Sequence, residues 1–449
     1  MPTGLLTDLY QLTMAAGYFE AGKAGERGTF ELFVRRLPPD RNFVLAAGLQ
    51  QAVEYLLNLR FTSEEIAYLR GLPQFAHTSG GFFDMLASLR FTGDLFAAPE
   101  GTPLFAGEPF LTLRAPLIEA QIPETFLLAT IGFQSMIATK AARVVKAALG
   151  RGVVEFGTRR AHSPEAGTLA ARAAYIGGCE GTSNTETGMR FGVPVFGTCS
   201  HAWVMSFPHE REAFEQLQKL LGESTVYLID TYDTVEGARR AAALGKPLWG
   251  LRLDSGNLVE LAPAVRKILD DAGLRDAKIM ATGDLNEHKI HELVAARAPI
   301  DMFGVGTELA TSADAPYLGV VYKLVELETS GKAAIKRYTL KLSEDKHTLP
   351  GSKQIFRYAD HDLLARSTEC PSCPPGSAPS EALLRPVIIG GRLVEPLPTA
   401  TQARKYAAES LAKLPAPCHS LFENPGAWKV DVSTELECLY ERVRQGVAQ

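Results

Sequence analysis

Glycine, threonine and charged side chains recur at the ends of short apolar segments in the middle of the chain. The segment Gly304 to Thr307 follows Met302 and Phe303, and the segment Thr282 to Asp284 follows Ile279 to Ala281. Glycines let backbone N–H groups approach phosphate oxygens, and a threonine hydroxyl adds a further donor. The two segments together predict a phosphate site, whereas a single G-x-G segment is equally compatible with a tight turn.

Two other segment ends carry paired charged groups. Asp230 is followed by Asp233, and Arg252 is followed by Asp254. Carboxylates can hold ribose hydroxyls or Mg²⁺, and a guanidinium can bind a carboxylate or a phosphate through two hydrogen bonds. A salt bridge at the edge of the sheet is the structural alternative. The glycine at position 256 favours close approach of a ligand.

An aromatic ring, two arginines and a histidine complete the main candidates. Phe156 directly precedes the segment Gly157 to Arg160, whose arginines can bind an anion, although core packing also explains the ring. His201 follows the apolar run Val193 to Phe196. It can act as an acid, a base or an acceptor of a phosphoryl group, whereas most single histidines are structural.

A pair of cysteines near the C-terminus has the spacing of half a zinc knuckle. Cys370 and Cys373 are separated by two residues, and Cys418, His419 and Cys438 could supply further ligands. Unpaired thiols in a loop explain the same spacing, so the identity of any metal ligand stays open.

The candidates need a scaffold whose segment ends converge. Asp230, Asp254, Gly283 and Gly306 follow one another at intervals of 24, 29 and 23 residues, and a helical pattern usually lies between them. Such repeats predict parallel strands joined by helices, and several in succession favour an α/β barrel over an open sheet. The ends of barrel strands share one face, so we expect the polar groups to surround one site.

Three regions of the 449 residues differ in their residue pattern, which agrees with the roughly three domains expected for a chain of this length. Residues 1–130 contain strand patterns such as Thr29 to Val34 and Gly101 to Leu113, and they predict an α+β domain. Residues 131–340 carry the barrel pattern. Residues 341–449 are expected to form a C-terminal extension that packs on the N-terminal domain, with a helix from Gln402 to Leu414.

The composition is that of an ordinary globular enzyme. There are 46 Lys and Arg against 51 Asp and Glu, and 46% of residues are hydrophobic, which excludes a disordered chain and a polybasic nucleic-acid binder. No apolar run reaches the roughly 18 residues of a membrane span. The start of the chain lacks the pattern of a signal peptide and there are only six cysteines, so we expect a cytoplasmic protein.

In this order, the motifs resemble those of nicotinate phosphoribosyltransferases. The similarity covers residues 5–357 and rests on these segments: Thr7 to Met14, Glu155 to Arg160, Gly181 to Asn184, Gly197 to His201, Asp230 to Asp233, Leu251 to Gly256, Gly304 to Thr307, Lys341 to Ser343 and Pro350 to Gln354. It implies the type II phosphoribosyltransferase fold, an irregular α/β barrel with a partly β N-terminal domain and a C-terminal extension. It also implies a homodimer whose active sites are shared between subunits.

The resemblance implies a reaction as well. Nicotinate and 5-phosphoribosyl 1-diphosphate would give nicotinate mononucleotide and diphosphate, with Mg²⁺ and coupled ATP hydrolysis, in the first step of NAD salvage from nicotinate. The resemblance implies that Tyr10 of the partner subunit and Phe156 stack on the pyridine, and that Arg252 and Thr198 bind nicotinate. It implies that the phosphoribosyl and phosphate groups are bound by Arg159, Gly283, Gly306 and Thr307. It also implies that Asp230 binds substrate, that Asp254 is catalytic and that ATP phosphorylates His201.

Two positions bear on specificity and on departures from the family pattern. Ser183 stands where related nicotinamide enzymes place an aspartate, which would accept a hydrogen bond from an amide but repel a carboxylate, so Ser183 favours nicotinate. Many relatives carry an aspartate where this sequence has Asn257. This difference weakens the expectation that position 257 binds Mg²⁺ or ribose.

Other functions remain as alternatives. A nicotinamide or quinolinate phosphoribosyltransferase would share the fold, and a barrel isomerase or lyase acting on a sugar phosphate would share the phosphate motifs. A non-catalytic nucleotide-sensing relative would keep the fold without turnover.

Overall fold

The computed structural model describes residues 4–329, 335–342, 348–370, 381–422, 424 and 426–447. They form two compact units. Unit 1 contains residues 1–136, 317–398 and 409–449, and unit 2 contains residues 137–316 and 399–408. The units therefore divide the chain near residues 136 and 317, whereas the sequence texture places its boundaries at 130 and 340.

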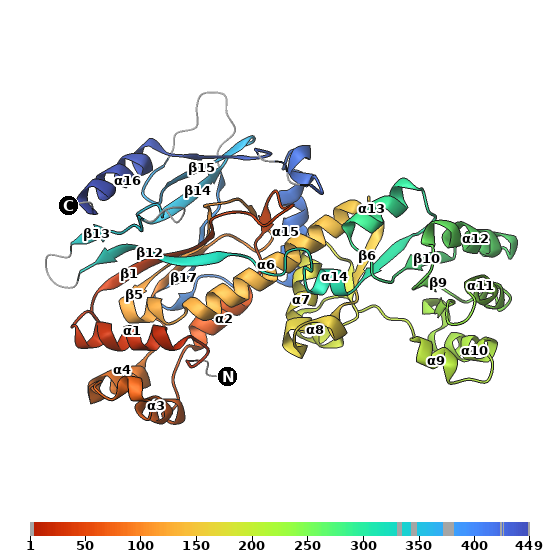
Figure 1. Ribbon diagram of the computed structural model, residues 1–449, viewed down its shortest axis with the longest axis horizontal. Helices are drawn as coiled ribbons and strands as arrows, with labels where there is room; N and C mark the ends of the chain where they lie inside the picture. The colour runs from red at the N-terminus through yellow and green to blue at the C-terminus, as the bar shows by residue number, and fades with distance from the viewer. Residues whose placement is uncertain are drawn as a thin grey trace. The chain divides into compact units, whose positions relative to one another are not determined.

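A seven-stranded sheet forms the centre of unit 1 (Figure 1). Its strands, in spatial order, are β13 (Lys336–Tyr338), β12 (Val320–Glu328), β1 (Arg27–Val34), β5 (Pro109–Pro116), β3 (Asp94–Ala97), β17 (Arg385–Ile389) and β18 (Arg392–Leu393). Strand β1 pairs antiparallel with both β12 and β5, and β17 pairs antiparallel with β3. N-terminal and C-terminal segments belong to one unit because their strands share this sheet.

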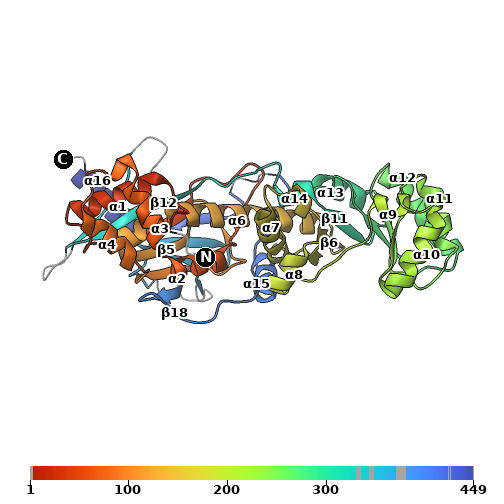
Figure 2. The ribbon, with the colours of Figure 1, turned by 90° about the horizontal axis from the view of Figure 1, so that it is seen from below.

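Both faces of that sheet are covered. On one side lie α1 (Leu9–Glu20), α2 (Leu49–Asn58), α3 (Ser63–Arg70), α4 (Gly80–Ser88) and α5 (Leu117–Gln121), as Figure 2 shows from below. On the other lie a four-stranded sheet of β16 (Glu381–Ala382), β14 (Lys353–Arg357), β15 (His361–Arg366) and β19 (Lys429–Val432), and helix α16 (Thr434–Val447). A short ribbon of β2 (Val44–Leu45) and β4 (Pro103–Leu104) completes unit 1. Residues 28–34 of β1 are consequently all buried.

Unit 2 is built on a parallel sheet of six strands. Their spatial order is β7 (Gly181–Thr182), β6 (Gly152–Glu155), β11 (Met302–Val305), β10 (Lys278–Ala281), β9 (Gly250–Leu253) and β8 (Val226–Leu228). Every neighbouring pair is parallel. The predicted α/β class with repeated strand–helix units is confirmed, while closure of the sheet into a barrel stays a prediction.

Helices connect these strands. They are α7 (Pro164–Ile176), α8 (Thr185–Phe191), α9 (His201–Met205), α10 (Glu210–Leu221), α11 (Thr234–Ala242), α12 (Leu258–Asp271) and α13 (Glu287–Ala295). Helix α14 (Thr307–Ala310) follows β11, the last of these strands in the chain, while α6 (Glu124–Ala147) and α15 (Ala400–Ala412) each extend over a unit boundary. Asn257 accepts a hydrogen bond from the Val259 N–H at 3.2 Å and so caps α12. An asparagine at this position thus has a structural use.

A buried ionic cluster fixes two strand ends of unit 2 to α6. The side chain of Lys140 is only 1% exposed, and its Nζ lies 2.6 Å from Glu287 Oε2 and 2.8 Å from Asp314 Oδ1. Arg143 donates from Nε to Glu287 Oε1 at 2.9 Å. Burial opposes ionisation of Glu287, but the charge and hydrogen bond of Lys140 outweigh it and lower its pKa. Glu287 begins α13 after β10, and Asp314 lies beyond α14, so the cluster links the segments that follow β10 and β11.

Removing this ammonium group should destabilise the protein. Lys140→Met leaves Glu287 buried with one cation fewer, and we expect a loss of about 3–5 kcal/mol in the free energy of unfolding, measured in urea at pH 7. Lys267→Met is the matched control, because the Lys267–Asp271 pair is exposed at the surface. It should leave the unfolding midpoint near the wild-type value. Equal losses in the free energy of unfolding for the two variants would contradict the stabilising role of the buried cluster.

Candidate active site

A cavity of about 430 Å³ opens at the carboxyl ends of the strands of unit 2. Its lining comes from the segments that follow β6 and β7, from the segment that precedes α9, and from β8 and β9. The lining residues are Phe156, Thr158, Arg159, Ser183, Gly197, Thr198, Cys199, Ser200, His201, Leu228, Arg252 and Asp254. Seven of the twelve predicted site residues are among them: Phe156, Arg159, Ser183, Thr198, His201, Arg252 and Asp254.

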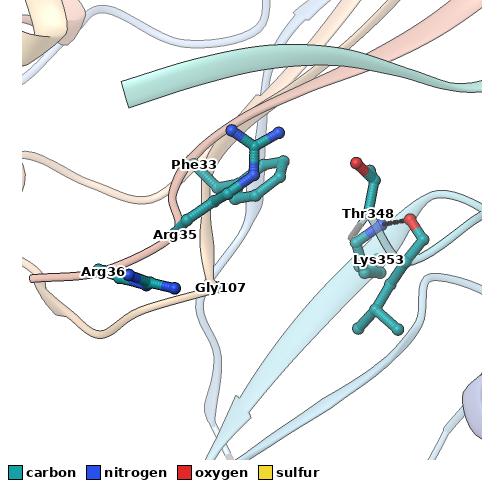
Figure 3. Close-up of a pocket in the computed structure, with 7 residues that line it drawn as sticks. Phe33, Arg35, Arg36, Gly107, Thr348 and Lys353 are labelled. Atoms are coloured by element: carbon teal, nitrogen blue, oxygen red, sulfur yellow. Dashed lines mark hydrogen bonds between the residues drawn. The ribbon is translucent and has the colours of Figure 1, made fainter. Parts of the chain in front are cut away.

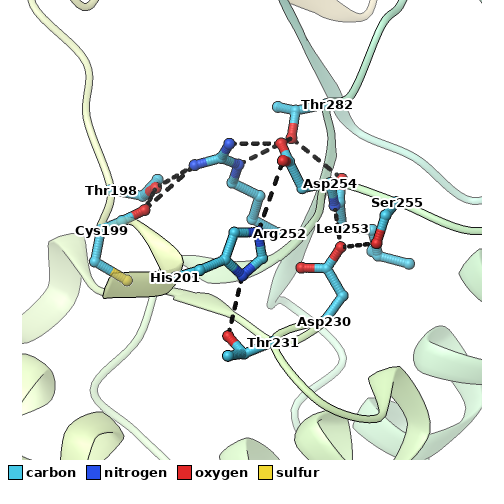
Figure 4. A network of polar contacts seen from close by, with 10 residues as sticks. All are labelled: Thr198, Cys199, His201, Asp230, Thr231, Arg252, Leu253, Asp254, Ser255 and Thr282. Carbon is cyan, nitrogen blue, oxygen red and sulfur yellow. Dashed lines mark hydrogen bonds and ion pairs between the residues drawn. The ribbon is translucent and has the colours of Figure 1, made fainter. Parts of the chain in front are cut away.

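Arg252 is the centre of the polar network in this cavity (Figure 4). Its Nη1 donates to Thr198 Oγ1 at 3.0 Å and to the carbonyl oxygen of Cys199 at 3.4 Å. Its Nε donates to Thr282 Oγ1 at 2.9 Å, and its Nη2 donates to Asp254 Oδ1 at 2.6 Å. The second hydrogen of Nη2 has no acceptor within the described residues and remains for a bound anion.

Asp254 is held in its ionised form by its neighbours. Burial penalises the charge, but a short hydrogen bond from the Thr282 hydroxyl and the positive charge of Arg252 outweigh that penalty and lower its pKa. Because the folded-state pKa is depressed, the carboxylate is charged at neutral pH. Its second oxygen is therefore a negative group facing the cavity.

Asp230, which follows β8, connects the end of that strand to the segment that contains Asp254. Its Oδ2 accepts from the Asp254 N–H at 2.9 Å and from the Ser255 hydroxyl at 2.6 Å. Its Oδ1 is buried and has no hydrogen-bond partner among the described residues. An unpartnered buried carboxylate oxygen is costly unless a cation or a donor reaches it, so Asp230 is a candidate ligand for a substrate hydroxyl or a metal ion.

His201 is the first residue of α9 and stands beside this carboxylate pair. Its Nδ1 lies 3.2 Å from the hydroxyl oxygen of Thr231, and its Nε2 lies 3.8 Å from Asp254 Oδ2. The imidazole is 41% exposed. Both ring nitrogens thus face protein groups, while part of the ring remains exposed to the cavity.

The Phe156 ring packs against a strand at a position where only a glycine, Gly304, leaves enough space. A Cβ atom at Gly304 would come 2.7 Å from the Phe156 ring and 2.5 Å from the Thr282 methyl group. The guanidinium carbon of Arg252 lies 5.9 Å from the centre of the same ring. Phe156 therefore borders the cavity beside the cation, which is a suitable arrangement for a flat anionic ring.

The remaining predicted phosphate residues lie next to the cavity lining. Gly283 follows β10 with a φ of +90°, and a side chain there would collide with the carbonyl of Asp254. Gly306 precedes α14, and Thr307 is the first residue of that helix. The glycine at position 283 is thus required both by its backbone conformation and by the close approach of the next strand end.

Tyr10 belongs to unit 1. It lies on α1 and is 49% exposed. Leu6, Leu9 and Met14 are exposed near it in the sequence and add apolar surface.

Three family models match the sequence. The nicotinate phosphoribosyltransferase N-terminal domain matches residues 5–132, the nicotinate phosphoribosyltransferase family matches residues 152–348, and the C-terminal domain matches residues 376–440. A nicotinate phosphoribosyltransferase of Mycobacterium tuberculosis is 43% identical over 452 residues, covering 98% of this chain and 94% of that protein. The chain belongs to the nicotinate phosphoribosyltransferase family.

Other members of the nicotinate phosphoribosyltransferase family and solved structures agree. The Bacillus subtilis nicotinate phosphoribosyltransferase is 44% identical over 363 residues, which cover 79% of this chain and 72% of that protein. The crystal structure of human nicotinic acid phosphoribosyltransferase matches with a TM-score of 0.84 and 30% identity, covering 97% of this chain and 99% of that chain. A nicotinate-nucleotide pyrophosphorylase from Pyrococcus furiosus matches with a TM-score of 0.74 and 27% identity over 92% of this chain and 95% of that chain. The α/β fold with a strand-rich N-terminal region that the resemblance implies is confirmed, while the closure of the barrel stays a prediction.

Three hydroxyl side chains of this network were not among the predicted site residues. Thr231 contacts His201, Ser255 contacts Asp230, and Thr282 bridges Arg252 and Asp254. Each is a direct neighbour in sequence of a chosen residue, but small hydroxyl residues at segment ends are too common to be singled out by type alone.

A second cavity, of about 320 Å³, lies in unit 1 and was not foreseen from the sequence. It is lined by Phe33, Arg35, Arg36, Gly107, Thr348, Leu349 and Lys353 (Figure 3). The Lys353 ammonium is held by the carbonyls of Leu349 and Gly351 and by Glu31 at 2.6 Å. The two arginines give this cavity a positive lining that suits an anion.

The cysteine pair near the C-terminus gives no described metal site. Cys370 is exposed, while Cys373 lies outside the described residues. Cys418 is buried, and its thiol donates to the carbonyl of Ala427 at 3.3 Å. Within the described ranges no group of three or more His, Cys, Asp or Glu side chains could hold a metal ion. Zinc binding by Cys370 and Cys373 stays an open prediction.

Among the helices that the structure describes, none is both long and apolar enough to cross a membrane.

Proposed function

We propose that this protein is a nicotinate phosphoribosyltransferase that forms nicotinate mononucleotide and diphosphate from nicotinate and 5-phosphoribosyl 1-diphosphate. One observation carries the proposal: the Phe156 ring, the Arg252 guanidinium and the carboxylates of Asp230 and Asp254 meet at one strand edge. An aromatic face and a cation suit a flat pyridine acid, and the carboxylates suit ribose hydroxyls or a cation. The names of the family and of its similar members support the same activity.

Catalysis by these residues is a matter of position and charge. The bond from ribose C1 to the diphosphate oxygen breaks as the pyridine nitrogen bonds to C1, through an oxocarbenium-like state. Phe156 and Arg252 would hold the ring so that its nitrogen points at C1, and Asp230 would orient the ribose. No side-chain nucleophile has to attack carbon, which fits the absence of an activated serine or cysteine among the described cavity residues.

Mg²⁺ fits the residues at this edge. Asp230 offers a buried oxygen without a partner, and Asp254 offers an ionised carboxylate that faces the cavity. Mg²⁺ is commonly held by one or two carboxylates together with substrate phosphates and water. When bound, it would neutralise charge on the departing diphosphate.

We further propose that His201 couples the reaction to ATP. An imidazole nitrogen would attack the γ-phosphorus of ATP, the bond to the β-phosphate oxygen would break, and ADP would leave. Water would later cleave the phosphorus–nitrogen bond and release phosphate. The exposure of His201 and its position beside Thr231 and Asp254 support this role.

A homodimer with shared sites follows from the same family resemblance. Tyr10 on α1 would stack on the pyridine in the partner subunit's cavity. The partly exposed side chains of Leu6, Leu9, Tyr10 and Met14 give that segment an apolar surface that association would cover.

Steady-state turnover with three ring substrates tests the proposal. Nicotinate should be converted with a kcat/KM at least roughly 100-fold above those of nicotinamide and quinolinate, because nicotinamide lacks a carboxylate for Arg252 and quinolinate brings a second negative charge to a cavity that already holds the ionised Asp254. Added ATP should increase the nicotinate rate. Preference for nicotinamide or quinolinate would favour those enzymes instead, and no turnover of any ring would support a non-catalytic relative.

A single substitution should alter the acid-versus-amide preference. Ser183→Asp places a carboxylate in the cavity lining, where it repels nicotinate and accepts from an amide. The ratio of kcat/KM for nicotinate to that for nicotinamide should fall by about tenfold or more. Ser183→Ala is the control and should change the ratio far less. An unchanged ratio in Ser183→Asp would reject this role.

Labelling with γ-³²P-ATP tests the role of His201. Wild-type protein should retain an acid-labile, base-stable phosphate, and His201→Ala should retain none. His209→Ala is the control, since His209 is exposed and lies outside the cavity lining. Equal labelling of His201→Ala and wild type would show that another residue is phosphorylated.

A further inference from the structure

Glu155 is a buried carboxylate directly behind the active-site cavity. It is the last residue of β6, it is 0% exposed, and it pairs in register with Thr182 of β7 and Val305 of β11. It does not line the cavity, and the proposed reaction gives it no role. A charged group in this position requires an explanation, because burial of a carboxylate without a cation is costly.

Its two oxygens bind two different segments. One oxygen accepts a short hydrogen bond from the Gly157 N–H, and the other accepts from the Thr182 hydroxyl at 2.6 Å. The backbone carbonyl of Glu155 also accepts from the Ser183 N–H at 3.0 Å. The carboxylate thus joins the segment after β6 to the segment after β7.

Both segments carry residues that line the cavity. Phe156, Thr158 and Arg159 come from the first segment, and Ser183 comes from the second. The two segments are also connected by Asn184, whose Nδ2 donates to Thr158 Oγ1 at 3.2 Å and whose backbone N–H donates to Thr182 Oγ1 at 3.0 Å. A change at Glu155 would therefore shift the pyridine-binding side of the cavity rather than its carboxylate pair.

We propose that Glu155 is a positioning residue for nicotinate, whose carboxylate sets the spacing between the Phe156 and Ser183 segments by accepting from both at once. The role rests on the proposed function for its substrate, and on the hydrogen bonds for its geometry. Only an ionised carboxylate accepts two donors with two free oxygens, and a protonated one must break or reverse one of these bonds.

The ionisation of Glu155 is sensitive to pH in a useful range. Burial raises its pKa to about 7, against the hydrogen bonds from Thr182 and Gly157 that favour the charged form. The Cys179 thiol, on a neighbouring segment, interacts electrostatically with the Glu155 carboxylate. Burial and the Glu155 charge both raise the pKa of this thiol, so it stays neutral. Arg404 of α15 donates to the carbonyl of Cys179 at 3.0 Å. No cation within the described residues pairs with Glu155.

The main test compares Glu155→Gln with wild type in steady-state turnover. At pH 8 the variant should raise KM for nicotinate roughly fivefold or more, with KM for 5-phosphoribosyl 1-diphosphate and kcat within about twofold of wild type. Wild type should approach the variant's nicotinate KM as the pH falls from 8 to 6, and the variant should not change further. Any effect of pH on the rest of the site or on the substrates is common to both proteins and cancels in the ratio of the two KM values. Equal effects on both KM values, or the wild-type pH profile in the variant, would overturn the proposal.

Two further variants keep the test decisive. Glu180→Gln makes the same chemical change at an exposed residue beside Gly152, at the other end of β6, and should behave as wild type. Thr182→Val removes one donor and should raise the nicotinate KM, while Thr182→Ser keeps the hydroxyl and should restore it. If Glu155→Gln does not fold, the Thr182 pair decides the outcome.

Unfolding measurements separate this proposal from the proposed function. A carboxyl whose pKa is raised in the folded state loses its proton first in the unfolded chain, so stability falls as the pH rises from about 4.5 to about 7. The urea midpoint of wild type should therefore drop relative to that of Glu155→Gln between pH 5 and pH 8. Absence of this drop would refute the buried ionisation whatever ring the enzyme uses. If the drop occurs but nicotinate is not turned over, the nicotinate assignment and the positioning role of Glu155 are both rejected. The ionisation of a buried Glu155 carboxylate would still be supported.

Discussion

The guanidinium of Arg252 is the interaction on which the site depends. It donates to Thr198 before α9, to Asp254 after β9 and to Thr282 after β10, so one cation holds three separate segment ends. Without it, the Asp254 carboxylate would lose the guanidinium that helps to keep it ionised. The same group that organises the protein is also the one that suits the carboxylate of a pyridine acid. A substitution of Arg252 would therefore disturb the positions of these segments and also remove the cation from the cavity.

Behind this edge, unit 2 uses buried charges to fix its loops. Lys140 joins Glu287 and Asp314 and so fixes the segments that follow β10 and β11. Glu155 joins Gly157 and Thr182 and so fixes the segments that follow β6 and β7. Parallel strands end in loops that share few hydrogen bonds with one another, and a buried ion can connect two of them through several directed bonds at once. The segments after β10 and β11 are joined by paired charges, whereas those after β6 and β7 are joined by a carboxylate that has no cation partner among the described residues.

Unit 1 contributes surfaces of a different kind. The exposed side chains of Leu6, Leu9, Tyr10 and Met14 are apolar, and the cavity lined by Arg35, Arg36 and Lys353 is cationic. The two surfaces therefore differ in chemistry, since one is apolar and the other is positively charged. The first group lies on and just before α1, and Lys353 of the second group lies on β14.

The sequence alone determined the strand–helix rhythm of unit 2 and the residue types at its strand ends. Apolar runs such as Leu248 to Leu253 must be buried, and the polar residues after them must stop the strand, so Arg252, Asp254 and Gly283 could be assigned to one edge. The tertiary structure alone decided which atoms meet. It placed Thr231 on His201, Thr282 between Arg252 and Asp254, and Glu155 between two segments 25 residues apart. These contacts depend on rotamers and on which strands become neighbours in the sheet, and the residue types along one chain do not by themselves specify these neighbours.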